Sequence, residues 1–181
     1  RVDLKHQGWP IWAGLFFTLF SRLLMQIKLI VLGKTDSKAI QELIQDYSAR
    51  LGHYIRFELE VIPDLKQSKS LSEALQKEKE GELILKKLLS SDELILLDER
   101  GKSYSSLEFA DFLQKKMNSG LKQLVFVVGG PYGFSEAVYA RAHGKISLSK
   151  MTLSHQMIRP FLIEQVYRAM TILRNEPYHH E

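Results

Sequence analysis

The sequence predicts an α/β fold in which a mostly parallel sheet is covered by helices on both faces. From Met25 onward, short apolar runs alternate with stretches whose apolar residues recur at helical spacing. Most of the apolar runs are continuous rather than alternating, as in strands that are buried on both faces.

The apolar runs predict five strands, over residues 27–32, 57–62, 93–97, 123–128 and 145–148. The helical patterns predict helices over residues 38–51, 70–89, 105–118 and 135–142, and a last helix whose apolar stripe spans residues 158–173. The second strand alternates apolar and acidic residues, so we expect it at an edge of the sheet, whereas the fourth is expected to be the most buried.

Two of the helices carry a capping-box spacing at their expected starts. Ser70 stands three residues before Glu73, and Ser105 stands three residues before Glu108. In such a box the serine and the acidic side chain each satisfy a backbone N–H of the first turn. We therefore place the starts of these helices at Ser70 and Ser105.

Residues 1–24 differ in composition from the rest of the chain and hold both tryptophans. Their apolar stretch lies between Pro10 and Arg22 and is shorter than the roughly 20 residues that a membrane span needs. We expect an extension outside the fold, with the functional protein beginning at Met25 and forming one domain over 25–181. The alternative is a signal peptide or a membrane anchor.

The composition limits the class of protein. The chain has no cysteine, which excludes disulfides and thiolate metal sites and favours the cytosol. Its net charge of +4 permits contact with phosphate groups without requiring it. The paired histidines near the end lack a metal-ligand spacing, so we expect no metal.

Three strands end in segments that point to a small-molecule site. Residues 98–102 follow the third strand, Gly129–Gly133 follows the fourth, and residues 149–155 follow the fifth. The carboxyl ends of parallel strands lie at one edge of a sheet, so these segments are expected to converge on one pocket. Taken alone, the glycine segment is also compatible with a tight turn, and residues 98–102 with a solvated polar turn.

Standard nucleotide motifs are absent from these loops. The glycines do not have the G-x-G-x-x-G spacing of a dinucleotide site. Lys28 stands where a P-loop ending in Gly33-Lys34-Thr35 would need its first glycine. Both kinds of site are therefore disfavoured.

The last helix has an apolar stripe that we expect to be core or a dimer contact. The stripe consists of Ile158, Phe161, Leu162, Val166, Ala169, Met170 and Leu173. Pro160 suits a first helical turn, which places His155 and Arg159 at the entrance of the helix beside the third loop. The chain ends in Tyr178-His179-His180-Glu181, which is either a functional tail or a frayed terminus.

From Met25 to Glu181 the chain closely resembles the ribosomal RNA large subunit methyltransferase H family, of the SPOUT class. The motifs that carry this resemblance are Leu97–Lys102, Phe126–Gly133, Leu148–His155, Glu164–Ala169 and Tyr178–His179. The prefix has no counterpart in the family. His180 stands where the family commonly has arginine or lysine, so a fixed positive charge becomes a titratable one.

The resemblance implies a SPOUT fold with a C-terminal trefoil knot, and a bent S-adenosylmethionine bound among the loops of the knot. The cofactor-binding residues that it implies are Leu97, Gly129, Leu148, Ser149, Lys150, Met151, Thr152 and Leu153. It further implies a homodimer that methylates N3 of a pseudouridine in helix 69 of 23S rRNA, on the assembled 70S ribosome.

The catalytic residues are a hypothesis built on this resemblance. The N3 proton must leave near neutral pH, so a base and a cation that stabilises the anion are expected. We assign His179 as the base and Arg159 as its electrostatic partner, with His155 and Tyr178 as further candidates. The residues expected to contact RNA are Lys150, Arg159, Arg168, Arg174 and His180.

Two other classes of protein remain open at this point. One is a non-catalytic RNA-binding or ribosome-binding module on the same fold, which would have no affinity for S-adenosylmethionine. The other is a flavodoxin-like protein, which the alternating pattern suggests although the phosphate loop after the first strand is missing.

Overall fold

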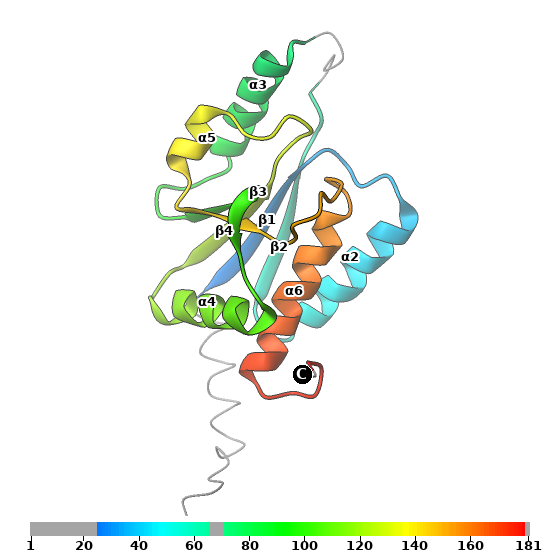
Figure 1. Ribbon diagram of the computed structural model, residues 1–181, viewed down its shortest axis with the longest axis vertical. Coiled ribbons are helices and arrows are strands. Elements are labelled where there is room, and N and C mark those ends of the chain that lie inside the picture. The colour runs from blue at the N-terminus through cyan, green and yellow to red at the C-terminus, as the bar shows by residue number, and fades with distance from the viewer. Residues whose placement is uncertain (1–24, 66–70, 180–181) are drawn as a thin grey trace, which may run out of the picture.

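The computed structural model describes residues 25–65 and 71–179. Five parallel strands form a sheet in the order β2-β1-β4-β3-β5, and helices lie on both of its faces (Figure 1). The strands are β1 (Gln26–Leu32), β2 (Arg56–Ile62), β3 (Glu93–Ser103), β4 (Gln123–Val128) and β5 (Gly144–Ser147). The helices are α2 (Lys38–Leu51), α3 (Glu73–Leu85), α4 (Ser106–Asn118), α5 (Glu136–Arg141) and α6 (Ile158–Leu173). The predicted α/β class is confirmed.

The strand order also removes one alternative. A flavodoxin-like sheet has the order 2-1-3-4-5, whereas here β4 lies between β1 and β3. The trefoil knot that the resemblance implies stays a prediction.

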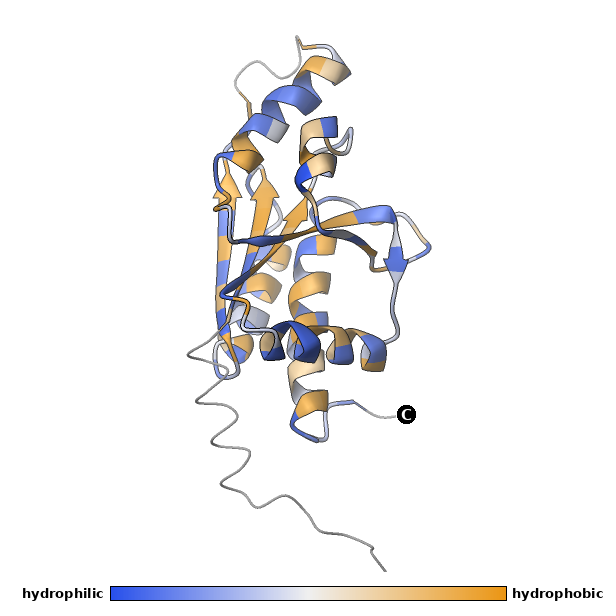
Figure 2. Ribbon diagram, turned by 90° about the vertical axis from the view of Figure 1, so that its left-hand side faces the viewer, coloured by the Kyte–Doolittle hydropathy of each residue, from blue (hydrophilic) through white to orange (hydrophobic). Residues whose placement is uncertain are grey.

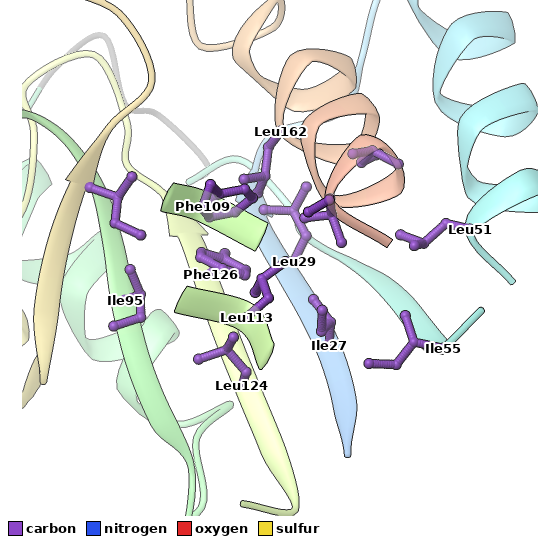
Figure 3. Packing of buried hydrophobic residues seen from close by; sticks show 14 of the residues in the cluster. Ile27, Leu29, Leu51, Ile55, Ile95, Phe109, Leu113, Leu124, Phe126 and Leu162 are labelled. Atoms are coloured by element: carbon purple, nitrogen blue, oxygen red, sulfur yellow. The ribbon is translucent and has the colours of Figure 1, made fainter. Parts of the chain in front are cut away.

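The core has two halves, one on each face of the sheet. Ile27 and Leu29 of β1 pack on the side of α2, α4 and α6, where Figure 3 shows Leu29 near Phe126. Ile30 points to the other side, toward α3 and α5. Because both faces are covered, the strands are apolar along most of their length, as the hydropathy colours of Figure 2 show.

The second strand lies at the edge of the sheet, as its alternating pattern predicted. Its Glu60 accepts ion pairs from Lys28 of β1 at 3.1 Å and from Lys87 at 2.7 Å. These contacts explain the lysine within the otherwise apolar first strand, because the lysine lies beside an acidic edge strand.

Local signals predicted one helix start correctly and missed another. The capping box at Ser105 and Glu108 is confirmed, with N–H to oxygen distances of 3.2 and 2.7 Å. The box expected at Ser70 is wrong, because α3 begins at Glu73, which is the first helical residue, and Ser72 is its N-cap. That helix also ends at Leu85 rather than near residue 89. Ser70 itself lies outside the described residues.

The third strand is longer than predicted. We expected it to end at Leu97, but β3 continues to Ser103, and Lys102 and Ser103 pair with β5 after a shift of register. Gly101 allows β3 and β5 to approach this closely, because a Cβ at that position would lie 2.5 Å from the backbone nitrogen of Ile146. Residues 98–102 are therefore an irregular strand rather than a free turn.

Within the described residues, none of the helices is both long and apolar enough to cross a lipid bilayer. Residues 1–24, for which we expected an extension outside the fold, lie outside the described residues.

Replacing Gly101 with alanine should destabilise the fold. The added methyl group overlaps backbone atoms of Ile146, which cannot rotate away, so we expect the free energy of unfolding to fall by about 1–3 kcal/mol. Urea unfolding of Gly101→Ala measures this loss, with the exposed neighbour Lys102→Ala as control. Equal stability of Gly101→Ala and the wild type would show that the two strands do not cross this closely.

Candidate functional site

One cavity lies beside residues 97–100 of β3 and the segments that follow β4 and β5. It has a volume of about 670 Å³, within the range of small-molecule sites. Leu97, Gly129 and Leu148, one from each of the three expected segments, all line it. The predicted convergence of the three loops is thus confirmed.

The lining of the cavity includes both apolar and charged side chains. The apolar part consists of Leu97, Val128, Pro131, Phe134, Ile146, Leu148, Met151, Leu153 and Ile158. The charged part consists of Lys77, Asp98, Glu99, Arg100 and Glu136. A ligand that suits both parts combines a flat or apolar group with a charged one.

Seven of the eight residues expected to bind the cofactor line this cavity. They are Leu97, Gly129, Leu148, Ser149, Met151, Thr152 and Leu153. Lys150 is exposed and is not among the lining residues, although its neighbours on both sides are. Its side chain is free for a contact outside the cavity.

Serine side chains shape the loop between β5 and α6. The Ser147 hydroxyl donates to the backbone oxygen of Ser149 at 2.8 Å, and the Ser149 hydroxyl accepts from the N–H of Met151 at 2.9 Å. The Ser154 hydroxyl accepts from the N–H of Met157 at 3.1 Å, just before α6 begins. Such local bonds hold a loop without regular structure in one conformation.

The glycine segment packs against a buried acid that the sequence analysis missed. Glu80 of α3 is buried, and its Oε1 accepts a hydrogen bond from Gln76 at 2.7 Å. A Cβ at Gly130 would overlap its Oε2, which has no hydrogen-bond partner within the described residues. Burial raises the pKa of Glu80, the bond from Gln76 opposes this, and the charge of Asp64 adds to the rise. The spacing of Gln76, Glu80 and Ile84 on one helix face was the available signal.

Asp98 presents an oriented carboxylate to the cavity. Its Oδ2 accepts from the Tyr139 hydroxyl at 2.7 Å and its Oδ1 from the N–H of Arg100 at 2.8 Å. Partial burial raises the pKa of Asp98, but these hydrogen bonds, together with the charges of Lys145 and Arg100, outweigh it and bring the pKa below its ordinary value. Burial and the same bond raise the pKa of Tyr139 to about 12. At neutral pH the carboxylate is ionised and the phenol is not.

Arg159 corrects one of our predictions. We expected it at an exposed helix entrance in contact with RNA phosphate, but it is only 1 % exposed. Its guanidinium donates to the backbone oxygens of Leu32 at 2.6 Å, Gly33 at 2.9 Å and His155 at 2.9 Å, and to the Thr35 hydroxyl at 2.9 Å. Burial lowers its pKa, and the charges of Asp64 and Asp36 oppose this. Its donors are used within the protein, so it is not available to a phosphate.

His155 lies at the cavity and is exposed. Its side chain is thus placed to meet a substrate, while its backbone oxygen is held by Arg159. Among the four catalytic candidates, it is the one that lines the cavity of its own chain.

The aromatic tail packs against the middle of α6. The Tyr178 hydroxyl donates to Glu164 at 3.0 Å, and its ring meets Tyr167 edge to face at 4.8 Å between centroids. The guanidinium of Arg168 lies 4.7 Å from the centre of the same ring. Burial, with the hydrogen bonds to Tyr47 and Glu164, raises the pKa of Tyr178.

The tail does not reach the cavity of its own chain. The cavity loop precedes α6 and the tail follows it, as Figure 1 shows. After α6 the chain turns back, so that Tyr178 contacts Glu164 and Tyr167 in the middle of the helix. Neither Tyr178 nor His179 is among the residues that line the cavity with His155. His180 lies outside the described residues.

The cations along α6 already have partners. Arg168 forms an ion pair with Glu164 at 2.7 Å. Arg174 lies 3.7 Å from Glu176 and 4.1 Å from the centre of the Tyr54 ring. Both are only partly exposed.

Comparison with known proteins identifies the class. Residues 25–179 match the family model described as "Predicted SPOUT methyltransferase". The chain belongs to this family of methyltransferases.

Individual relatives are closely similar over the same part of the chain. The chain is 67% identical to the ribosomal RNA large subunit methyltransferase H of Flavobacterium johnsoniae, over 87% of this chain and 100% of that protein. It is 67% identical to the protein of the same name from Parabacteroides distasonis and 59% identical to that from Porphyromonas gingivalis, with the same coverage.

Replacing Arg159 with methionine should destabilise the protein strongly. The change leaves the buried oxygens of Leu32 and Gly33 without donors, so we expect a loss of roughly 2–4 kcal/mol in the free energy of unfolding. The control is Arg174→Met, which changes a partly exposed arginine on the same face of the sheet. It should lower the free energy of unfolding by about 1 kcal/mol or less. Denaturant unfolding of the two variants checks the difference. Equal losses would contradict the structural role of Arg159.

The raised pKa of Glu80 predicts a pH dependence of stability. A carboxyl whose pKa is higher in the folded than in the unfolded state stabilises the fold below the unfolded pKa, and this contribution is lost as pH rises through the folded pKa. Glu80→Gln stays neutral, so wild type should lose stability relative to this variant above about pH 4.5. Thermal unfolding between pH 4 and 8 tests this, with the exposed Glu82→Gln as control. A constant difference between wild type and Glu80→Gln would refute it.

Proposed function

We propose that this chain is an S-adenosylmethionine-dependent rRNA methyltransferase. It methylates N3 of a pseudouridine in helix 69 of 23S rRNA, on the assembled 70S ribosome. The observation that carries this proposal is the single cavity beside residues 97–100 of β3 and the segments that follow β4 and β5, in a chain of the SPOUT methyltransferase family. The name of the close relatives supports rRNA as the substrate.

The residues of the cavity fit S-adenosylmethionine. Its apolar part suits an adenine ring, and its charged part suits the ammonium and carboxylate groups of the amino-acid end. Gly129 allows close packing beside the cavity, because a Cβ there would lie 3.1 Å from the ring of Phe134. When bound, S-adenosylmethionine supplies a methyl group that its sulfonium already activates.

The remaining work of the protein is to orient the acceptor, exclude water and take up one proton. Orientation of N3 toward the methyl group is a proximity effect. The N3 proton needs a base, for which His179 is our assignment, with His155 and Tyr178 as alternatives. The correction at Arg159 changes its role, because its buried charge orients the start of α6 instead of contacting the substrate.

We place the tail of one protomer at the cavity of its partner, in a homodimer. This arrangement is supported by the lining of the cavity, which includes neither Tyr178 nor His179 of its own chain. Met157, the N-cap of α6, and Phe161 in its first turn are 47 % and 41 % exposed and offer an apolar contact for the second copy. Light scattering should show a dimer, and a monomer at all concentrations would contradict this arrangement.

We expect basic side chains outside the cavity to contact the RNA. Lys150 is exposed beside it, while Arg168 and Arg174 can offer phosphate only the donors that their acidic neighbours leave free. Affinity for RNA should decrease with salt, because counterions are released on binding.

The central experiment is methyl transfer to ribosomes that lack the modification. Mass spectrometry of 23S rRNA should locate one new methyl group on the helix 69 pseudouridine. Calorimetry with S-adenosylmethionine distinguishes the enzyme from a non-catalytic ribosome-binding module, because such a module would bind ribosomes but not this cofactor.

Replacing His179 with alanine tests the base. If His179 removes the N3 proton, turnover at saturating S-adenosylmethionine should fall by about 100-fold or more. His53→Ala changes an exposed histidine and should leave turnover within about twofold of wild type. Unchanged turnover of His179→Ala on ribosomes would exclude it as the base and make His155 the next candidate.

A further inference from the structure

One carboxylate of the cavity is held in a way that the other acidic residues are not. Asp98 directly follows the buried residues Leu94–Leu97 of β3 and is itself half buried. Glu99 and Glu136 also line the cavity, but both are exposed and neither makes a hydrogen bond within the described residues. Water screens their charges, whereas Asp98 is partly shielded from it.

The two oxygens of Asp98 are oriented but not saturated. Each accepts one hydrogen bond, from Tyr139 and from the N–H of Arg100. A carboxylate can accept about four such bonds, so about half of its capacity remains. No lysine or arginine nitrogen within the described residues lies within 4.0 Å of its oxygens, so it forms no direct ion pair. Burial raises its pKa, but the two hydrogen bonds and the more distant charges of Lys145 and Arg100 outweigh this and keep it ionised.

A second charged group, of the opposite sign, lines the same cavity. Lys77 of α3 is partly buried and makes no ion pair within the described residues. An anion and a cation that both lack an ion-pair partner suit a ligand that is itself a zwitterion. The amino-acid end of S-adenosylmethionine is such a group, with one ammonium and one carboxylate.

We propose that Asp98, oriented by Tyr139, binds the α-ammonium group of S-adenosylmethionine and thereby determines specificity for a nucleoside that carries an amino-acid end. This assignment rests on the proposed function. Lys77 faces the carboxylate of the same ligand. Tyr139 is a positioning residue, because it acts through the carboxylate that it holds.

The test compares three ligands by calorimetry on the full chain. S-adenosylmethionine and S-adenosylhomocysteine both have the amino-acid end, whereas 5′-methylthioadenosine keeps the nucleoside and lacks that end. Asp98→Asn preserves the shape of the side chain and removes its charge. It should weaken the binding of the first two ligands by the same factor, roughly 10- to 100-fold. The affinity for methylthioadenosine should stay within about twofold of the wild-type value.

Two further variants sharpen the comparison. Tyr139→Phe keeps the charge of Asp98 and removes its orienting bond, so a smaller loss of about three- to tenfold is expected, again only for ligands with the amino-acid end. Asp111→Asn removes the same charge from an exposed site on α4 and is the matched control. Thermal unfolding of each variant shows whether the fold is intact.

Several outcomes would overturn the assignment. If Asp98→Asn lost as much affinity for methylthioadenosine as for the other ligands, Asp98 would lie at the nucleoside. If it lost more affinity for S-adenosylmethionine than for S-adenosylhomocysteine, Asp98 would lie at the sulfonium. A loss in Glu99→Gln as large as in Asp98→Asn would show that general charge, not a direct bond, is responsible. If the wild type binds none of the three ligands, the proposed function itself fails.

Discussion

The buried guanidinium of Arg159 joins the two parts of the molecule on which the cavity depends. One part is the end of β1 and the turn that follows it, and the other is the loop that leads into α6. Taking a cation out of water is costly, and here the backbone oxygens at the end of a strand supply the compensation. These oxygens would otherwise be buried without donors. The same contacts therefore satisfy the backbone and hold His155 and Ile158 at the cavity wall.

Much of the fold could be predicted because the strands are apolar on both faces and the connections are helical. The edge position of β2 followed from its acidic alternation, and the capping box at Ser105 from two residues in the right spacing. The continuation of β3 beyond Leu97 was missed, because charged residues at 98–100 resemble a turn unless the pairing partner is known. Only the structure shows that Gly101 lies against the backbone of β5.

The location of the cavity could be predicted from the sequence, but the roles of its individual residues were harder to predict. Convergence of three strand ends requires only that the strands be parallel, so Leu97, Gly129 and Leu148 could be grouped without coordinates. The burial of Arg159 could not, because an arginine near a helix start is usually exposed. Nor could the separation of Tyr178 from the cavity, which depends on the direction in which α6 crosses the sheet. Glu80 was hidden for a different reason, since a charged residue in a charged helix gives little sign of which face is covered.

The acidic edge strand has a consequence for how copies of the protein can associate. An exposed sheet edge is a template on which another chain can add a strand, and charged side chains there oppose such pairing. Glu58 and Glu60 of β2, together with the lysines that bind them, line this border of the sheet. Strand addition at β2 would place two such acidic rows side by side. The charges along β2 therefore oppose the pairing of two copies of the chain through this edge.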